Sequence, residues 1–251
     1  MSKSGLASVT FRRLNYKEII SLTKEALLNG IEWGGDIHVP AGDAQTAALV
    51  GKATVAAGLS VLSYGSYFNV GADGSAAEDF VPALSSAVKL KAPVIRVWAG
   101  DKGSAVCGRE YFKQTVSNTQ TICDMAMQEN ITVCFEYHRD TPTDNSKSAV
   151  SLIKAAGRKN LKTYWQPNPD ISFEKNLTEL SDVLPYLEHI HVFHWPDNAR
   201  HPLSGGFDQW QEYINIIKSD GKPHSYILEF VKDDSAEQFL EDAHALLALI
   251  K

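Results

Sequence analysis

The stretch that decides the fold spans residues 93–137. It begins with PVIRVW at 93–98, continues with GREYFKQTVSNTQTICDMAMQEN at 108–130 and ends with TVCFEY at 132–137. The two outer segments are short, apolar and rich in β-branched residues, which is typical of buried strands. The middle segment carries its apolar residues at helical spacing. A strand, a long helix and a second strand together predict two parallel strands joined by a crossover.

The same alternation continues in both directions along the chain. Strands are predicted at residues 7–11, 30–33, 60–64, 93–98, 132–137, 162–165, 189–193 and 225–230. Helices are predicted at 16–30, at 76–90, at 108–130 and at 235–250, the first with Asn15 as its N-cap and Gly30 as its C-cap. Eight strands at this spacing predict an α/β protein, a single (β/α)8 TIM barrel domain over residues 1–251.

Composition and charge exclude several classes of function. The 251 residues are 44% apolar and 22% charged, as in ordinary globular domains. The net charge of −6 opposes binding to nucleic acid and to anionic membranes, so a small neutral ligand is expected. Cys107, Cys123 and Cys134 lack CxxC spacing, so no disulfide framework is predicted. With no secretory or membrane-spanning segment in the sequence, we expect a cytoplasmic protein.

Polar side chains gather at the carboxyl ends of the predicted strands, where TIM barrels carry their functional residues. Glu136 and Glu229 each follow an apolar strand, and His191 lies near the end of another. A buried carboxylate is costly unless a cation or hydrogen bonds compensate it, so a divalent metal shared by both glutamates is one explanation. The alternative is a structural ion pair to Arg96 or Arg139, with His191 as a core histidine. Glu32 is equally well explained as an internal hydrogen-bond acceptor or as a site residue.

Four motifs resemble those of a known family. They are GIEWGGDIHVP at 30–40, FEYH at 135–138, HIHVFHW at 189–195 and ILEFV at 227–231. In order and spacing they are similar to the second, fifth, seventh and eighth strands of the xylose-isomerase-like barrels, a family that includes sugar isomerases, ketose 3-epimerases and dehydratases. The resemblance covers nearly the whole chain. It implies a divalent metal ion, Mn²⁺, Mg²⁺ or Co²⁺, bound by Glu136, Gln166, His191 and Glu229.

The chain departs from the family pattern at the second ligand. In TYWQPNPD at 163–170, Gln166 stands where the family has Asp, and Asn168 stands near a frequent substrate-contacting His. A Gln carbonyl oxygen can coordinate a hard cation but supplies no charge, so weaker metal binding is expected. Asp170, further past the strand, is the alternative ligand.

The resemblance implies an isomerase or epimerase that acts on a sugar or sugar phosphate through an enediolate, with Glu136 and Glu229 as catalytic bases. The residues expected to bind the substrate are His38, Tyr64, Arg96, Trp98, His138, Asn168, His194 and Arg200. A metal-dependent dehydratase and a non-catalytic sugar-binding barrel stay open as alternatives. Few basic residues beyond Arg96, Arg139 and Arg200 lie at the strand ends, which favours an unphosphorylated substrate. The sequence leaves the oligomeric state open, including a homo-oligomer.

Overall fold

The computed structural model describes residues 2–71 and 76–251, and in it eight parallel strands close into a barrel in chain order. The strands are β1 (Lys3–Ala7), β2 (Gly30–Gly34), β3 (Ser60–Asn69), β4 (Val94–Trp98), β5 (Thr132–Phe135), β6 (Leu161–Trp165), β7 (Leu187–Val192) and β8 (Ser225–Leu228). The helices are α1 (Tyr16–Glu25), α2 (Ala44–Ala56), α3 (Ala76–Leu90), α4 (Arg109–Gln128), α5 (Ser146–Ala156), α6 (Phe173–Val183), α7 (Phe207–Lys218) and α8 (Ala236–Ile250). The predicted TIM barrel is confirmed.

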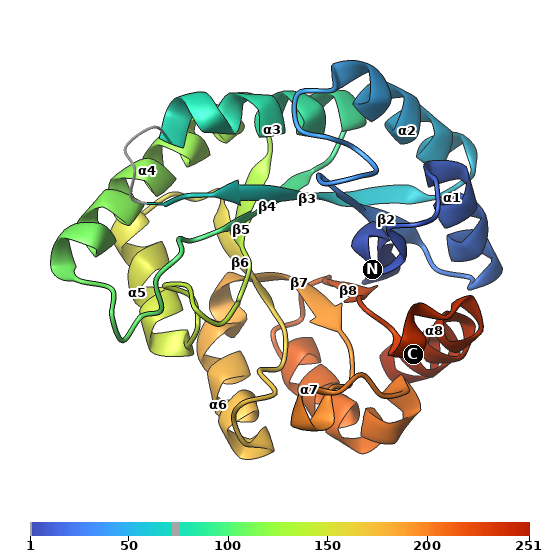
Figure 1. The fold of residues 1–251 in the computed structure, drawn as a ribbon. Coiled ribbons are helices and arrows are strands. Elements are labelled where there is room, and N and C mark those ends of the chain that lie inside the picture. Colours follow the sequence, from blue (N-terminus) through green and yellow to red (C-terminus); the bar gives the residue numbers. More distant parts are fainter. Residues whose placement is uncertain (1, 72–75) are drawn as a thin grey trace.

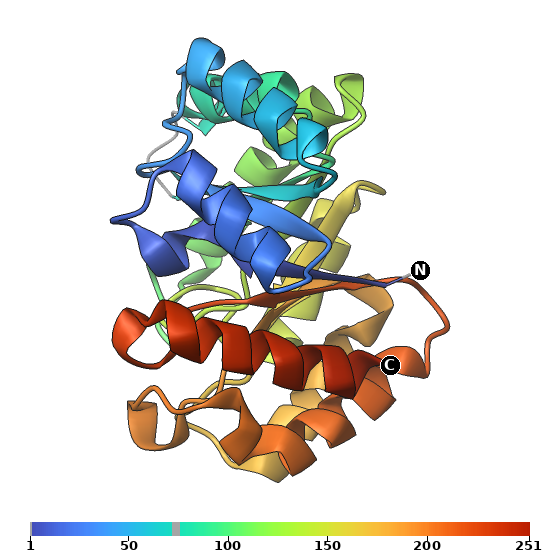
Figure 2. The same cartoon turned by 90° about the vertical axis from the view of Figure 1, so that its right-hand side faces the viewer.

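The helices form a ring around the strands (Figure 1). The barrel closes where β8 pairs with β1, so the beginning and the end of the chain lie side by side (Figure 2). A large apolar cluster fills the space between strands and helices. A second, small cluster packs separately from it and consists of Ala7, Val9, Leu62, Val94, Cys134, Tyr164 and Ile227. These side chains plug the interior of the barrel.

Local sequence signals explain where several helices begin. The side chain of Asn15 accepts hydrogen bonds from the backbone N–H groups of Lys17 and Glu18, and the Glu18 carboxylate accepts the N–H of Asn15 at 2.7 Å. This reciprocal capping confirms the predicted start of α1. Ser235 likewise accepts the N–H of Gln238 at the start of α8. Helix α3 has the bounds predicted from its periodicity.

Three sequence predictions at element ends are wrong, and one of them is the strand predicted at 60–64, which continues to Asn69 as β3. Residues 7–11 were expected to form the first strand, but β1 ends at Ala7 and Ser8–Phe11 form a 3-10 helix, η1. The side chains of Ser8 and Thr10 accept the backbone N–H groups of Gly34 and Phe230, at 2.8 and 3.0 Å, so η1 is tied to the ends of β2 and β8. Gly30 was expected to cap α1, but it begins β2, and the helix ends at Glu25.

The remaining short helices lie in connections: η2 (Leu184–Tyr186), η3 (Pro196–Asn198), η4 (Leu203–Gly206) and η5 (Lys232–Asp234). Helices η3 and η5 contain residues with positive φ, Asp197 at 53° and Asp233 at 59°. Within the described ranges, no helix combines the length and the apolar character needed to cross a bilayer.

Candidate functional site

Four strands place a polar side chain in the barrel mouth in the same way. Each carries an interior side chain from the small cluster, followed two positions later by a polar residue on the same face of the chain. The pairs are Val94 and Arg96, Cys134 and Glu136, Tyr164 and Gln166, and Ile227 and Glu229. His191 joins this polar layer from β7, where it pairs in register with Ile227. The alternation of the strands therefore stacks a polar layer on an apolar plug.

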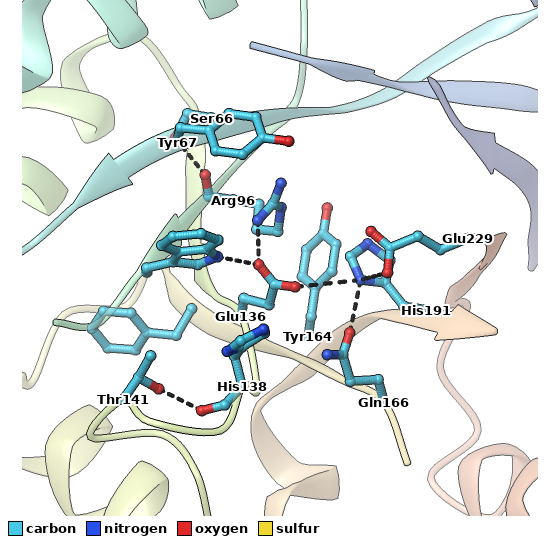
Figure 3. A network of polar contacts seen from close by, with 12 residues as sticks. Ser66, Tyr67, Arg96, Glu136, His138, Thr141, Tyr164, Gln166, His191 and Glu229 are labelled. Carbon is cyan, nitrogen blue, oxygen red and sulfur yellow. Dashed lines mark hydrogen bonds and ion pairs between the residues drawn. The ribbon is translucent and has the colours of Figure 1, made fainter. Parts of the chain in front are cut away.

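The four residues expected to bind a metal converge in this layer (Figure 3). Glu136, His191 and Glu229 are buried, and one ligand atom from each lies within 4.8 Å of the others. Nδ1 of His191 is 2.9 Å from Oε1 of Gln166 and 3.4 Å from Oε2 of Glu229. Asp170, the alternative ligand, lies outside the group and pairs with Arg139 and Asn198.

The two oxygens of Glu136 have different surroundings. Oε2 accepts hydrogen bonds from Nη1 of Arg96 and from Nε1 of Trp98. Oε1 faces Nδ1 of His191 at 3.9 Å. The ion pair to Arg96 that the sequence left open is therefore present, and it leaves one oxygen of Glu136 turned toward the other three residues.

Glu32 is a member of the site that sequence reasoning left undecided. Its buried carboxylate accepts hydrogen bonds from Oγ of Ser63 at 2.6 Å and from the hydroxyl of Tyr164 at 2.8 Å. It lies 3.2 Å from Nε2 of His191, and 3.6 Å from Nε of Arg96. Metal-binding histidines commonly hold a carboxylate on the second ring nitrogen, which fixes the tautomer of the ring. Glu32 stands in that relation to His191.

Burial and charge set the protonation of this group. Burial acts to raise the pKa of Glu32 and of Glu136, but His191 and Arg96 outweigh it and hold both carboxyl groups below their usual pKa. For Glu229 burial prevails, and its pKa is raised. Burial acts to lower the pKa of His191, but the charges of Glu229 and Glu32, with the hydrogen bond to Glu32, raise it to about 9.

These residues fit a divalent cation by charge and by donor type. Three glutamates, Glu32, Glu136 and Glu229, are buried around Arg96. Their carboxyl groups can carry more negative charge than the one guanidinium balances. Carboxylate and amide oxygens with one imidazole nitrogen are ligands that Mg²⁺, Mn²⁺ and Co²⁺ accept. A divalent ion at Nδ1 of His191 would balance this excess negative charge. Without the ion, protonation of His191 balances part of it.

Three of the residues expected to bind substrate lie next to this group. Arg96 and Trp98 contact Glu136, and the ring of His138 stacks on Trp98 with centroids 5.7 Å apart. A narrow cleft of about 70 Å³, lined in part by His138, Gln166 and Asn168, opens beside them. Asn168 borders it, but its side-chain oxygen accepts the N–H of Asp170 within a turn.

Other expected substrate contacts lie elsewhere. His38 lies against Trp33, whose indole bonds to α2, and its Nε2 is 2.9 Å from the carbonyl of Leu14. Tyr64 donates its hydroxyl to the carbonyl of Val39. The ring of His194 packs over Gly205 and Gly206. The contacts of His38 and Tyr64 are with loop backbone, whereas His194 also lines a separate cleft of about 170 Å³ with Asn168 and Trp195. Arg200 lies at the rim, where Nη1 is 2.6 Å from Oδ1 of Asp234.

Tyr67, and not Tyr64, is the tyrosine of β3 that faces the site. Its ring lies 5.9 Å from that of Trp98, and the guanidinium of Arg96 lies over it at 5.8 Å. The pairing of β3 with its neighbours shifts register twice. Such irregularities change which side chains point inward, and a simple alternation in the sequence does not reveal them.

Comparison with known proteins identifies the family of the chain. Residues 20–249 match the family described as xylose isomerase-like TIM barrel. The chain belongs to this family. Among curated members, it is 28% identical over 108 residues to the 3-dehydroshikimate dehydratase of Bacillus anthracis, a match that spans 41% of this chain and 37% of that protein.

Solved structures of this family share the fold over nearly the whole chain. The probable 3-DHS dehydratase AsbF of Bacillus anthracis superposes with a TM-score of 0.82 at 22% identity, covering 98% of this chain and 99% of that one. D-Psicose 3-epimerase of Clostridium cellulolyticum H10 gives 0.77 at 13% identity, covering 99% and 98%. L-Ribulose 3-epimerase gives 0.76 at 11%, covering 99% and 94%. At these identities the likeness establishes the barrel alone.

Proposed function

We propose that this protein is a divalent-metal-dependent enzyme that removes a proton next to the carbonyl group of a polyhydroxylated substrate, as sugar isomerases and epimerases do. The observation that carries the proposal is the convergence of Glu136, Gln166, His191 and Glu229 on one point in the barrel mouth. Family members with epimerase and dehydratase names both act on compounds that contain neighbouring hydroxyl and carbonyl groups. Proton removal beside the carbonyl is the step that these reactions share.

The chain's own residues supply proton transfer and positioning. A divalent ion held by Glu136, Gln166, His191 and Glu229 would polarise the substrate carbonyl and stabilise negative charge on its oxygen. Glu229 is buried, and burial raises its pKa, which suits a group that accepts and returns a proton. Arg96 and Trp98 hold Oε2 of Glu136, so Oε1 is left facing the His191 group, where metal and substrate would meet.

The positions of the two glutamates favour epimerisation. They reach the site from the ends of β5 and β8, on either side of His191. One oxygen of Glu136 lies 3.9 Å from Nδ1 of His191, and one oxygen of Glu229 lies 3.4 Å from the same atom. A proton taken by one carboxylate and replaced by the other on the opposite face of the substrate carbon inverts that carbon. Return of the proton by a single carboxylate to the neighbouring carbon would instead give isomerisation.

A dehydratase is the second candidate, and the similarity to 3-dehydroshikimate dehydratase favours it. The first step is the same proton removal. The carboxyl group that has taken the proton would then pass it to a hydroxyl group one carbon further on, which leaves as water while the electron pair forms the new double bond. The products distinguish the two candidates, because dehydration of 3-dehydroshikimate yields an aromatic ring.

Exchange of substrate hydrogen with solvent deuterium tests the shared step. Purified protein loaded in turn with Mn²⁺, Mg²⁺ or Co²⁺ is incubated in D₂O with D-psicose, D-tagatose, L-ribulose or 3-dehydroshikimate and followed by NMR. We expect deuterium at the carbon next to the carbonyl, with an epimer or an aromatic product. Glu136→Gln and Glu229→Gln should each slow exchange by about 10²- to 10⁴-fold. Binding of these compounds without exchange would instead support the non-catalytic sugar-binding barrel.

A further inference from the structure

A second cleft, of about 520 Å³, opens on the same face of the barrel, between η1 and the loop after β8. Three arginines line it, Arg12 and Arg13 from the N-terminal side and Arg200 from the loop after β7. The sequence had placed few basic residues at this face. Arg12 and Arg13 come to it because η1 turns the chain across the barrel mouth just before them.

Phe230 organises the arginines. Its φ of 52° is unusual for a bulky residue, and its N–H is held by Oγ1 of Thr10 at 3.0 Å. The guanidinium of Arg12 lies 5.6 Å from the centre of its ring and that of Arg200 lies 4.8 Å from it. Cation–π contacts of this kind orient a guanidinium as well as stabilise it. One ring thus holds two positive charges beside the same cleft.

Each guanidinium is anchored along one edge and keeps other N–H groups for a ligand. Asp36 accepts from Nε of Arg12 and Asp234 from Nη1 of Arg200, both at 2.6 Å. Arg12 also donates from Nη2 to the hydroxyl of Tyr67. Within residues 2–71 and 76–251, no hydrogen bond is made by Nη1 of Arg12 or by Nε and Nη2 of Arg200. The side chains are 41% and 36% exposed, so these donors are accessible.

Aspartates limit the net charge of the cleft. Asp233 and Asp234 line it together with the three arginines, and Asp36 pairs with Arg12. General electrostatic attraction is therefore small. Recognition would come from directed N–H groups, which guanidinium presents in a planar fork that matches carboxylate and phosphate oxygens.

Residues that line the cleft connect to the candidate active site in two ways. Phe230 directly follows Glu229 in the chain. Arg12 reaches Tyr67, and the ring of Tyr67 lies against Arg96, which pairs with Glu136. The cleft at Phe230 is therefore a neighbour of the candidate active site.

We propose that Arg12 and Arg200 bind an anionic group of the substrate, a carboxylate or a phosphate, while its carbonyl end lies at the Glu136, His191 and Glu229 group. This inference rests on the proposed function and makes it more specific. It replaces the uncharged, unphosphorylated sugar expected from the sequence with an acid or a phosphate ester that carries hydroxyl and carbonyl groups.

Two matched pairs of unreactive probes test the proposal by calorimetry on the metal-loaded protein. Shikimate and its methyl ester differ in the charge of the carboxyl group and in one methyl group, and ribitol 5-phosphate and ribitol differ only in the phosphate. We expect the charged member of one pair to bind at least tenfold more tightly than its neutral partner. The pair that shows the preference identifies the anionic group as carboxylate or phosphate.

Variants then assign the preference to the cleft. Arg12→Gln and Arg200→Gln should each reduce the preference for the charged probe severalfold. Arg200→Lys keeps the charge but loses the planar fork of N–H groups, so its preference should lie between those of Arg200→Gln and the unchanged protein. Arg158→Gln is the matched control, because Arg158 forms an exposed ion pair with Asp124 in the helical layer. Thermal melting of each variant verifies that it is folded.

Equal binding of charged and neutral partners in both pairs would overturn the proposal. The proposal would also be overturned if Arg12→Gln and Arg200→Gln both kept the full preference for the charged probe. Because the probes do not react, the result is independent of the solvent-exchange experiment. An arginine-dependent preference without any exchange would retain the anion site and reject the proposed enzymatic function.

Discussion

Nε2 of His191 lies 3.2 Å from Oε1 of Glu32, while Nδ1 of the same ring lies 3.4 Å from Oε2 of Glu229. An ionised carboxylate only accepts hydrogen bonds, so Glu32 keeps the hydrogen of His191 on Nε2. Nδ1, once it has lost its own proton, would then offer its lone pair to a cation among Glu136, Gln166 and Glu229. Glu32 is in turn held by Ser63 and Tyr164, which makes the orientation of the ring rigid.

Replacement of Glu32 by glutamine should weaken metal binding without unfolding the barrel. The amide can donate to Nε2 and favour the wrong tautomer, and loss of such a partner typically lowers metal affinity about 10- to 100-fold. Calorimetric titration with Mn²⁺ measures the change. Glu179→Gln is the control, since Glu179 is also buried and accepts the hydroxyl of Tyr137 away from this group. Equal losses in both variants would mean that Glu32 acts on stability only.

The amide at position 166 should limit metal affinity. Gln166→Asp places a charged carboxylate, on a side chain one methylene shorter, where the amide oxygen now faces Nδ1 of His191, so we expect Mn²⁺ to bind about tenfold or more tightly. Gln166→Ala should bind it more weakly than the unchanged protein. Asn168→Asp adds the same charge two residues away, outside the group. If Asn168→Asp raised the affinity for Mn²⁺ as much as Gln166→Asp does, the gain would come from the added charge alone and not from coordination of the ion.

The barrel was predictable because periodicity is a local property of the chain. The helix at 76–90 and the strand ends at Glu136, His191 and Glu229 follow from patterns within a few residues. Tyr64 was expected to bind the substrate instead of Tyr67 because the side that each tyrosine faces depends on irregular pairing between strands. Arg12 was missed and Glu32 was left undecided for a related reason. Their roles depend on partners more than 20 residues away in the chain, Asp36 for Arg12 and His191 for Glu32.

Metal binding should release a proton near neutral pH. In the metal-free protein the pKa of His191 is raised to about 9, so the ring is protonated at pH 7, and a cation at Nδ1 must displace that proton. Calorimetry in buffers of different ionisation enthalpy should report close to one proton released per ion at pH 7. Release should fall toward zero above pH 9. Release that is absent at pH 7 would show that His191 is neutral before the ion binds.

The stability of the metal-free protein should also fall as the pH rises. A group whose pKa is higher in the folded than in the unfolded chain stabilises the fold below its unfolded pKa, and this contribution is lost as the pH passes the folded value. For His191 that window runs from its usual value to about 9. The melting temperature should therefore drop across this range. It should drop less with Mn²⁺ bound, and less in His191→Gln.

Gly65 should not tolerate a side chain. A Cβ atom there would lie 3.0 Å from Nη2 of Arg96 and 3.0 Å from Oε1 of Glu32, two buried groups that are fixed by their ion pairs. Overpacking of this kind costs about 1–3 kcal/mol, which chemical denaturation of Gly65→Ala should detect. Gly108→Ala is the control, because a Cβ atom at that position meets nothing within 4 Å.

Trp98 should matter for turnover more than for metal binding. Its indole N–H and Arg96 share Oε2 of Glu136, so Trp98→Phe keeps the aromatic packing on His138 but frees one constraint on the carboxylate. Hydrogen bonds to charged groups contribute about 1.5–3 kcal/mol, so kcat for the exchange reaction should fall about tenfold or more. The affinity for Mn²⁺ should change less, because Oε1 and the other three residues are untouched. Trp33→Phe removes an equivalent indole hydrogen bond, to Thr54 on the helix side of the barrel, and should lower the melting temperature with little effect on kcat. A parallel loss of kcat in both variants would indicate that Trp98 supports the fold and does not position Glu136.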